Sequence, residues 1–237
     1  MGTLLNIATV LVGGMLGLLF GARLPERIRQ TVVAGLGLFT AAIGVSLILD
    51  SINVTIVLLA LLIGGVLGEW WQIEAALTRL GEWLQMRFAA GEGGSTRFVR
   101  GFLTASLVFC VGPLTILGSI QDGLTGDYEL LAIKSTLDGF AAMVFASTLG
   151  VGVLFSTLVI LVYQGGISLL ASQAQAIFTE PMIAELSATG GVLLLGIAVS
   201  SLLEIKPIRV ANFLPALVIA PLIVAILAQW GLSIAIP

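Results

Sequence analysis

The chain has 237 residues, of which 58% are hydrophobic and only 10% are charged, and its net charge is −3. Because soluble globular domains carry about 25% charged residues, this composition excludes a soluble core and predicts an all-α integral membrane protein with the lipid bilayer as its partner. The absence of a basic block argues against nucleic acid as a partner.

Eight stretches of the chain are apolar and long enough to cross a membrane as helices, each of which needs about 20 residues. They are predicted at about 3–21, 31–49, 54–68, from 98 through Pro113, 131–149, 151–170, 186–203 and 210–230. Treating 131–164 as one helix would give seven spans, but it would place Lys206 and Arg209 outside the cell. We therefore predict about eight spans in a single membrane domain over 1–237.

One long polar stretch, residues 69–97, separates the third span from the fourth. The apolar residues of its first part fall on one helical face, and Trp70, Trp71 and Trp83 are rings of the kind that lie at headgroup level. We predict a cytoplasmic amphipathic helix on the membrane surface here. The sequence GEGGST (91–96) then forms a flexible linker back to the bilayer.

The distribution of basic residues predicts the orientation, because Lys and Arg concentrate in cytoplasmic loops. With the N-terminus outside, nine of the ten Lys and Arg fall in or beside inside segments. The outside segments, 50–53, 119–130 and 171–185, contain acidic residues but no Lys or Arg. Only Lys134 departs from this pattern. Both termini are therefore predicted to lie outside.

A glycine motif occurs twice, as LVGGMLG (11–17) and as LIGGVLG (62–68), and TGGVLLLG (189–196) is a fainter version. Small residues of this kind allow membrane helices to approach closely, and we favour this packing interpretation. The alternative is an internal repeat, which many transporters contain.

The stretch VGPLTILGSIQDGLTGD (111–127) interrupts the fourth span. Pro113 lacks an N–H and clashes with the preceding turn, so it predicts a kink or break that frees backbone groups within the membrane. Discontinuous helices beside polar side chains form the binding sites of many transporters. The candidate binding residues here are Thr115, Ser119, Gln121 and Asp122. The alternative is a packed proline kink, with the aspartate solvated outside.

The predicted fifth span contains Lys134 and Asp138, with Ser135 beside them. The i,i+4 spacing places the two charges on one helical face, where they can pair. An isolated charge at this depth costs a few kcal/mol, about 2.5–3.5 on insertion scales, so a partner is expected and a functional site is indicated. The alternative is a purely structural ion pair.

Three amides lie in or near apolar spans: Asn6 in the first, Gln164 in the sixth and Asn212 in the eighth. Asn6 and Asn212 are candidate binding residues, although a buried amide can also simply bond a neighbouring helix. Pro215 and Pro221 predict a broken last span.

The sequence argues against an enzyme. It contains no histidine and a single cysteine, Cys110, so a Ser–His triad, a zinc protease and an intrachain disulfide are excluded. There is no Walker-type phosphate loop. GLTGD (123–127) lacks both the G-x-G-D pattern and the Tyr-Asp partner of intramembrane aspartyl proteases. We expect no cofactor and no metal.

Three segments carry a resemblance to a known family. They are the opening GTLLNIATVLVGGMLGLLFG, the central CVGPLTILGSIQDGLTGDYELLAIKSTLDGFAAMVFASTLGVGV and the closing GGVLLLGIAVSSLLEIKPIRVANFLPALVIAP. They resemble the YqgA/YdfK-like bacterial inner-membrane proteins, which form domain-of-unknown-function family 554. The resemblance implies a bacterial multi-pass inner-membrane protein, of a kind often labelled a transport protein, without implying a substrate.

These observations favour a secondary transporter or facilitator of a small ion or solute. Asp138 is the candidate for proton or ion coupling, and Lys134 is its counter-charge or the contact for an anionic substrate. One alternative is a passive channel formed by a homo-oligomer, because small-residue faces favour self-association. Another is a non-transporting scaffold or assembly subunit that docks through the surface helix around 70–87.

Overall fold

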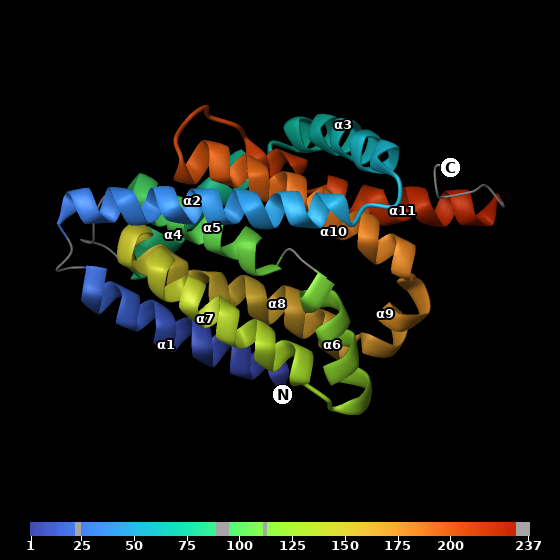
Figure 1. The fold of residues 1–237 in the computed structure, drawn as a ribbon, viewed down its shortest axis with the longest axis horizontal. Helices are drawn as coiled ribbons and strands as arrows, with labels where there is room; N and C mark the ends of the chain where they lie inside the picture. The colour runs from blue at the N-terminus through green and yellow to red at the C-terminus, as the bar shows by residue number, and fades with distance from the viewer. Residues whose placement is uncertain (22–24, 89–94, 111–112, 231–237) are drawn as a thin grey trace. The chain divides into compact units, whose positions relative to one another are not determined.

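The structure, a computed structural model, describes residues 1–21, 25–88, 95–110 and 113–230. Within these ranges the elements are helices, and none is a strand (Figure 1). The α-helices are α1 (Gly2–Gly21), α2 (Glu26–Leu49), α3 (Val54–Trp71), α4 (Ile73–Phe88), α5 (Ser95–Cys110), α6 (Pro113–Thr125), α7 (Glu129–Leu149), α8 (Ser156–Leu169), α9 (Ala171–Ile177), α10 (Glu180–Ile197) and α11 (Ala216–Gln229). Three short helical turns are η1 (Val151–Phe155), η2 (Ala198–Leu202, a π-helix) and η3 (Val210–Phe213).

The span count predicted from the sequence is confirmed. Seven helical stretches are long and apolar enough to cross a membrane alone, and α5 with α6 forms an eighth as a pair bent by 63°. The bend falls where predicted, because α6 begins at Pro113 and proline is tolerated in the first turn of a helix. Gly150 turns the chain between α7 and η1 with a left-handed φ of 84°, so 131–170 contains two spans.

Several predicted boundaries were wrong. The outside segment predicted at 119–130 is helical up to Thr125, and the one predicted at 171–185 contains α9 and the start of α10. Both stretches are rich in the polar residues that are typical of loops. In the fold, other parts of the chain form hydrogen bonds with some of these residues, so the helices continue through them.

The junction of the third span and the surface helix also differs from its prediction. The third span continues to Trp71, and Gln72 ends it by adopting a left-handed φ of 52°. The helix predicted to lie on the membrane surface, α4, therefore begins at Ile73 rather than at 69. The last span changes geometry at Pro215, between η3 and α11, whereas Pro221 lies inside the continuous α11.

The described residues form two compact units. Unit 1 comprises Met1–Leu36, Thr78–Cys110 and Leu114–Gln175, and unit 2 is made mainly of Gly37–Leu77 with the chain from Ala176 onward. Each unit therefore combines spans from distant parts of the sequence.

In unit 1, α1 lies beside α7 and α8 (Figure 1). A Cβ at Gly13 would lie 2.0 Å from the carbonyl oxygen of Gly139, and a Cβ at Gly17 would lie 2.0 Å from that of Met143. Only glycine permits so close an approach of the two backbones. The packing interpretation of the first glycine motif is therefore confirmed.

In unit 2, α3 packs against α11 through the second glycine motif. A Cβ at Gly64 would lie 2.5 Å from the amide nitrogen of Ala216, and a Cβ at Gly68 would lie 1.8 Å from the carbonyl oxygen of Asn212. Buried apolar side chains from α3, α10 and α11 extend the contact, namely Ile56, Met182 and Val224. Close packing is thus the role of this motif as well.

The contacts in unit 1 also give the direction of the bent span. Residue numbers rise together along the α1–α7 contact, from Gly13 with Gly139 to Gly17 with Met143, so these two helices are parallel. Along the chain, the spans α2 and α3 lie between α1 and α7, and each reverses the direction of the chain across the membrane. A third crossing is needed before α7 can run parallel to α1, so α5 and α6 together must cross the membrane once.

Candidate functional site

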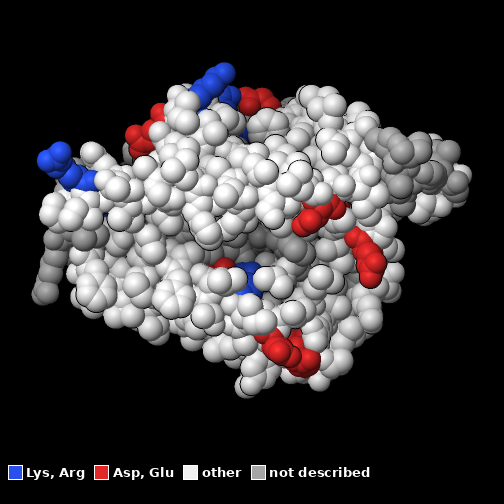
Figure 2. All heavy atoms as spheres, in the orientation of Figure 1, with Lys and Arg blue, Asp and Glu red and all other residues white. Residues whose placement is uncertain are grey.

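The face of the molecule in Figure 2 shows few charged side chains, which stand in small groups on an otherwise uncharged surface. Among the described residues of the spans, in contrast, four acidic or basic side chains are buried, namely Asp122, Lys134, Asp138 and Glu185. Charged groups in membrane spans are expensive unless they are paired, and they mark functional sites by default. The candidate site is therefore built from these residues and their partners.

The closest helix pair of unit 1 contains the centre of the site. Lys134 and Asp138 lie one turn apart on α7, and the Lys134 ammonium donates to Oδ2 of Asp138, as their spacing predicts. Asn6 of α1 reaches the same carboxylate, because the glycines further along α1 bring the two backbones together. The amide Nδ2 of Asn6 donates to Oδ2 of Asp138 at 2.9 Å.

A third helix, α8, extends this network. Asn6 Nδ2 also donates to Oε1 of Gln164 at 2.9 Å, and Gln164 Nε2 donates to the Thr3 hydroxyl at 3.3 Å. The Thr3 and Ser168 hydroxyl oxygens lie 3.4 Å apart. We call Thr3, Asn6, Lys134, Asp138, Gln164 and Ser168 the polar network of unit 1. Thr3 and Ser168 were missed from the sequence, because single hydroxyls are common in apolar helices and their spacing gives no signal.

One acceptor of this network has no partner. Asn6 is completely buried, and its carbonyl oxygen Oδ1 has no hydrogen-bond partner among the described residues. A carboxylate can only accept, so the NH₂ group of Asn6 must face Asp138 and its oxygen must point elsewhere. A buried polar atom without a partner is rare and costs about 1–3 kcal/mol. The network therefore offers a free acceptor beside an ion pair.

Three of the four candidates on the bent span each have a different environment. Thr115 donates to the carbonyl oxygen of Phe109 at 3.3 Å, so it satisfies a group that the break at Pro113 frees. Ser119 is completely buried, and its hydroxyl has no hydrogen-bond partner among the described residues. Gln121 lies at the exposed end of α6, where it donates to Asp127 at 2.7 Å.

The remaining two candidates of unit 1 each have hydrogen-bond partners outside the network. Asp122 is buried and accepts hydrogen bonds from the amino group of Met1 at 3.0 Å and the backbone N–H of Gly2 at 3.1 Å. It therefore fixes the start of α1. Ser135 is buried and donates to the carbonyl of Leu131 on its own helix at 2.5 Å. The structure thus joins Asn6, Lys134 and Asp138 in one network.

Comparisons with known proteins match nearly the whole chain. Residues 1–225 match the family described as "Protein of unknown function (DUF554)". The chain belongs to this family. It is 33% identical over 231 residues to "Uncharacterized protein YqgA" of Escherichia coli (strain K12), covering 97% of this chain and 98% of the relative. It is 30% identical over 235 residues to "Uncharacterized membrane protein YdfK" of Bacillus subtilis (strain 168), covering 98% of each. No solved structure matches.

In this DUF554 protein the last candidate, Asn212, lies in unit 2. Its Nδ2 donates to Glu69 at 2.6 Å, and its Oδ1 accepts from the backbone N–H of Glu74 at 2.8 Å. Asn212 therefore ties η3 to the junction of α3 and α4. Its partners in the sequence are more than a hundred residues away, so this role could not be inferred from the apolar span around it.

Unit 2 of the DUF554 chain also contains a buried carboxylate in the segment predicted to lie outside, 171–185. Glu185 of α10 is completely buried and accepts from the backbone N–H groups of Ile52 and Asn53, each at 2.8 Å. The Ser51 hydroxyl donates to its other oxygen at 2.9 Å. Glu185 thus holds the turn before α3. Within the described ranges, no group of three or more His, Cys, Asp or Glu could hold a metal ion.

Proposed function

We propose that this membrane protein is a secondary transporter or facilitator of a small ion or solute, and that the polar network of unit 1 is its binding site. The observation that carries the proposal is a buried Lys134–Asp138 ion pair joined to Asn6, whose carbonyl oxygen lacks a partner. Ionisable groups inside spans typically mark ion pathways and proton relays.

Each residue has a role that its position supports. Both Lys134 and Asn6 donate to Oδ2 of Asp138, and within the described residues no hydrogen bond reaches the other carboxylate oxygen. Asp138 is therefore proposed to accept a proton or cation, with Asn6 Oδ1 as a second acceptor. Lys134 then acts as the counter-charge that the arriving ion must compete with, or as the contact for an anionic solute.

The first experiment is thermal unfolding of the purified protein across a panel of inorganic cations, inorganic anions and small organic solutes. A specific ligand raises the unfolding free energy by mass action, by about 2.7 kcal/mol at a hundredfold excess over Kd. We expect one class of ligand to stabilise the wild type but not Asp138→Asn. The matched control is Asp127→Asn, because Asp127 is an exposed carboxylate of the same unit.

Flux in proteoliposomes then tests the mechanism with the ligand identified. Saturable, Asp138-dependent flux that supports counterflow is expected for a transporter, whereas fast, non-saturating conductance would identify a passive channel. If no ligand stabilises the wild type selectively and Asp138→Asn changes only stability, the pair is structural and the transport proposal fails. Copurification with a fixed partner would then indicate a scaffold.

A further inference from the structure

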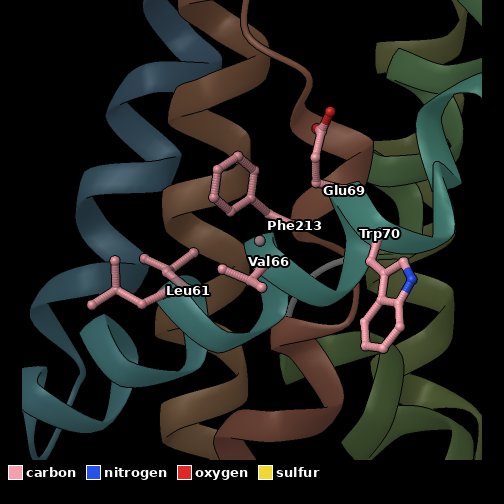
Figure 3. Close-up of a pocket in the computed structure, with 7 residues that line it drawn as sticks. Leu61, Val66, Glu69, Trp70 and Phe213 are labelled. Carbon is pink, nitrogen blue, oxygen red and sulfur yellow. The ribbon is translucent and has the colours of Figure 1, made fainter.

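A groove of about 570 Å³ lies along α3 in unit 2, within the size range of ligand pockets, about 300–1,000 Å³ (Figure 3). Its walls are apolar over most of their length. The apolar lining residues are Leu61, Leu62, Gly65, Val66, Trp70 and Phe213. Glycine at position 65 shapes the groove, because a Cβ there would lie 2.7 Å from the Phe213 ring.

The groove opens toward the lipid. Leu62, Val66 and Trp70 are 59%, 68% and 78% exposed, and they belong to a helix with the length and composition of a membrane span. Apolar side chains with this exposure on a span contact acyl chains.

One end of the groove is charged. Glu69 lines it, and the Arg209 guanidinium donates to one oxygen of the Glu69 carboxylate. Asn212 holds the other oxygen at 2.6 Å, so the carboxylate is fixed in place. The Glu69 and Arg209 side chains remain 57% and 69% exposed. Trp70, an amphipathic ring typical of headgroup level, follows Glu69 on α3 and also lines the groove (Figure 3).

We propose that this groove binds one phospholipid with an ammonium-bearing zwitterionic headgroup, such as phosphatidylethanolamine. The acyl chain lies against the apolar walls, the headgroup ammonium donates to Glu69, and the phosphate accepts from Arg209. The argument is charge complementarity, because the groove ends in one fixed negative and one positive group, and such a headgroup presents one of each.

Other occupants match the groove less well. An anionic lipid such as phosphatidylglycerol offers no cation to Glu69 and places a second negative charge near it. A choline headgroup is zwitterionic but has no N–H to donate to the carboxylate. A second copy of the chain would have to bury the exposed Glu69–Arg209 pair, which is costly without new partners.

The test uses the full chain in vesicles of phosphatidylcholine that contain a trace of phosphatidylethanolamine with a photoreactive group in its acyl chain. After illumination, labelled peptides are mapped by mass spectrometry, and unlabelled phosphatidylethanolamine, phosphatidylcholine and phosphatidylglycerol are compared as competitors. We expect labelling on α3 and Phe213. Phosphatidylethanolamine should compete about threefold better than the others, the effect expected of one solvent-exposed ion pair.

Three variants separate the groove from its headgroup site. Leu62→Trp fills the groove and should abolish its labelling. Leu58→Trp is the matched control, since Leu58 is similarly exposed one turn away on α3 but does not line the groove, and labelling should persist. Glu69→Gln should retain labelling but lose the preference for phosphatidylethanolamine.

Two results overturn the proposal. Equal competition by all three lipids, or labelling that Leu62→Trp does not reduce, would mean that the groove contacts bulk lipid only. Absence of labelling together with cross-links between α3 helices of two copies would mean that a second chain covers the groove. Neither result bears on transport through unit 1, so this inference can fail independently of the proposed function.

Discussion

Units 1 and 2 are built around the same kind of helix but use their buried charge differently. In each unit a glycine-rich helix, α1 or α3, begins where a buried carboxylate binds backbone N–H groups. That carboxylate is Asp122 in unit 1 and Glu185 in unit 2. Each of these helices then packs closely against a partner, α7 or α11, through its glycines.

The likeness extends along the sequence. Aligning Gly13 of α1 with Gly64 of α3 shifts the residue numbers by a fixed amount, and the same shift aligns Gly2 with Asn53. Gly2 and Asn53 each donate a backbone N–H to the buried carboxylate of their own unit. Applied to α7, the same shift aligns Lys134 with Glu185. These two residues carry opposite charges and lie on different helices, α7 and α10.

The two charges are compensated by different groups. Glu185 is held mainly by backbone N–H groups of the turn before α3, which cannot move without unfolding that turn. Lys134 is compensated by side chains alone, Asp138 and through it Asn6, and one of the acceptors in that network is unused. Side chains can exchange partners at little cost to the fold. The comparison therefore favours unit 1 as the exchangeable site and unit 2 as a structural one.

The largest expected effect tests the likeness of the two units. Gly17→Ala and Gly68→Ala each place a Cβ within about 2 Å of a backbone carbonyl, at 2.0 Å and 1.8 Å. Each should lower the free energy of unfolding by about 3 kcal/mol or more, because overpacking moves whole helices. Thermal unfolding in detergent measures both losses.

The controls are Gly35→Ala and Gly166→Ala, since a Cβ at either position meets nothing within 4 Å. These should be neutral or gain up to about 1 kcal/mol, because alanine loses less backbone entropy in a helix. If Gly17→Ala unfolds the protein and Gly68→Ala does not, the two glycine contacts are not equivalent.

The second prediction tests the difference between the units. Lys134→Met leaves the Asp138 carboxylate buried without its counter-charge and should cost about 3–5 kcal/mol. The double variant Lys134→Met with Asp138→Leu should recover most of that loss, because a matched apolar pair can replace a buried ion pair. A double-mutant cycle in thermal unfolding gives the coupling energy.

The matched variant in unit 2 is Glu185→Gln. It should cost about 1–3 kcal/mol, because a neutral amide oxygen accepts more weakly than a carboxylate from the two backbone N–H groups of Ile52 and Asn53. A single-residue rescue is not expected there, since the partners are backbone groups. If the double variant of unit 1 were as unstable as Lys134→Met, the loss of stability in Lys134→Met would not come from the unpaired Asp138 carboxylate.

Sequence patterns predicted the parts of this fold that depend on local chemistry. The spans follow from apolar length, the break from the missing N–H of Pro113, and the Lys134–Asp138 pair from its i,i+4 spacing. The predicted orientation with both termini outside stays a prediction.

What could not be predicted depends on contacts between distant residues. Asp122 and Glu185 resemble loop residues in sequence, because the N–H groups that they bind belong to helices or turns more than a hundred residues away. The same holds for Asn212 with Glu69, and for Thr3 and Ser168 with Gln164. Single hydroxyls and carboxylates carry no periodic signal, so only the tertiary fold identifies their partners.

The smallest expected effect is a pH dependence in unit 2. Partial burial raises the pKa of Glu74 above its ordinary value of 4.5, against the lowering effects of the Ala211 N–H and the Arg209 charge. A carboxyl with a raised folded-state pKa binds protons more readily in the folded state. Its stabilising contribution is therefore fully present below pH 4.5 and is lost as pH rises through the folded-state pKa.

Glu74→Gln removes this titration and keeps an oxygen that can accept from Ala211. The wild type should therefore gain stability relative to Glu74→Gln as the pH falls from 7 toward 4.5, by less than about 1 kcal/mol because the group is partly solvated. Thermal unfolding of both proteins across that range measures the difference. A wild type that instead loses stability relative to Glu74→Gln on acidification would show that hydrogen bonding from Ala211 and attraction to Arg209 outweigh burial at this carboxyl.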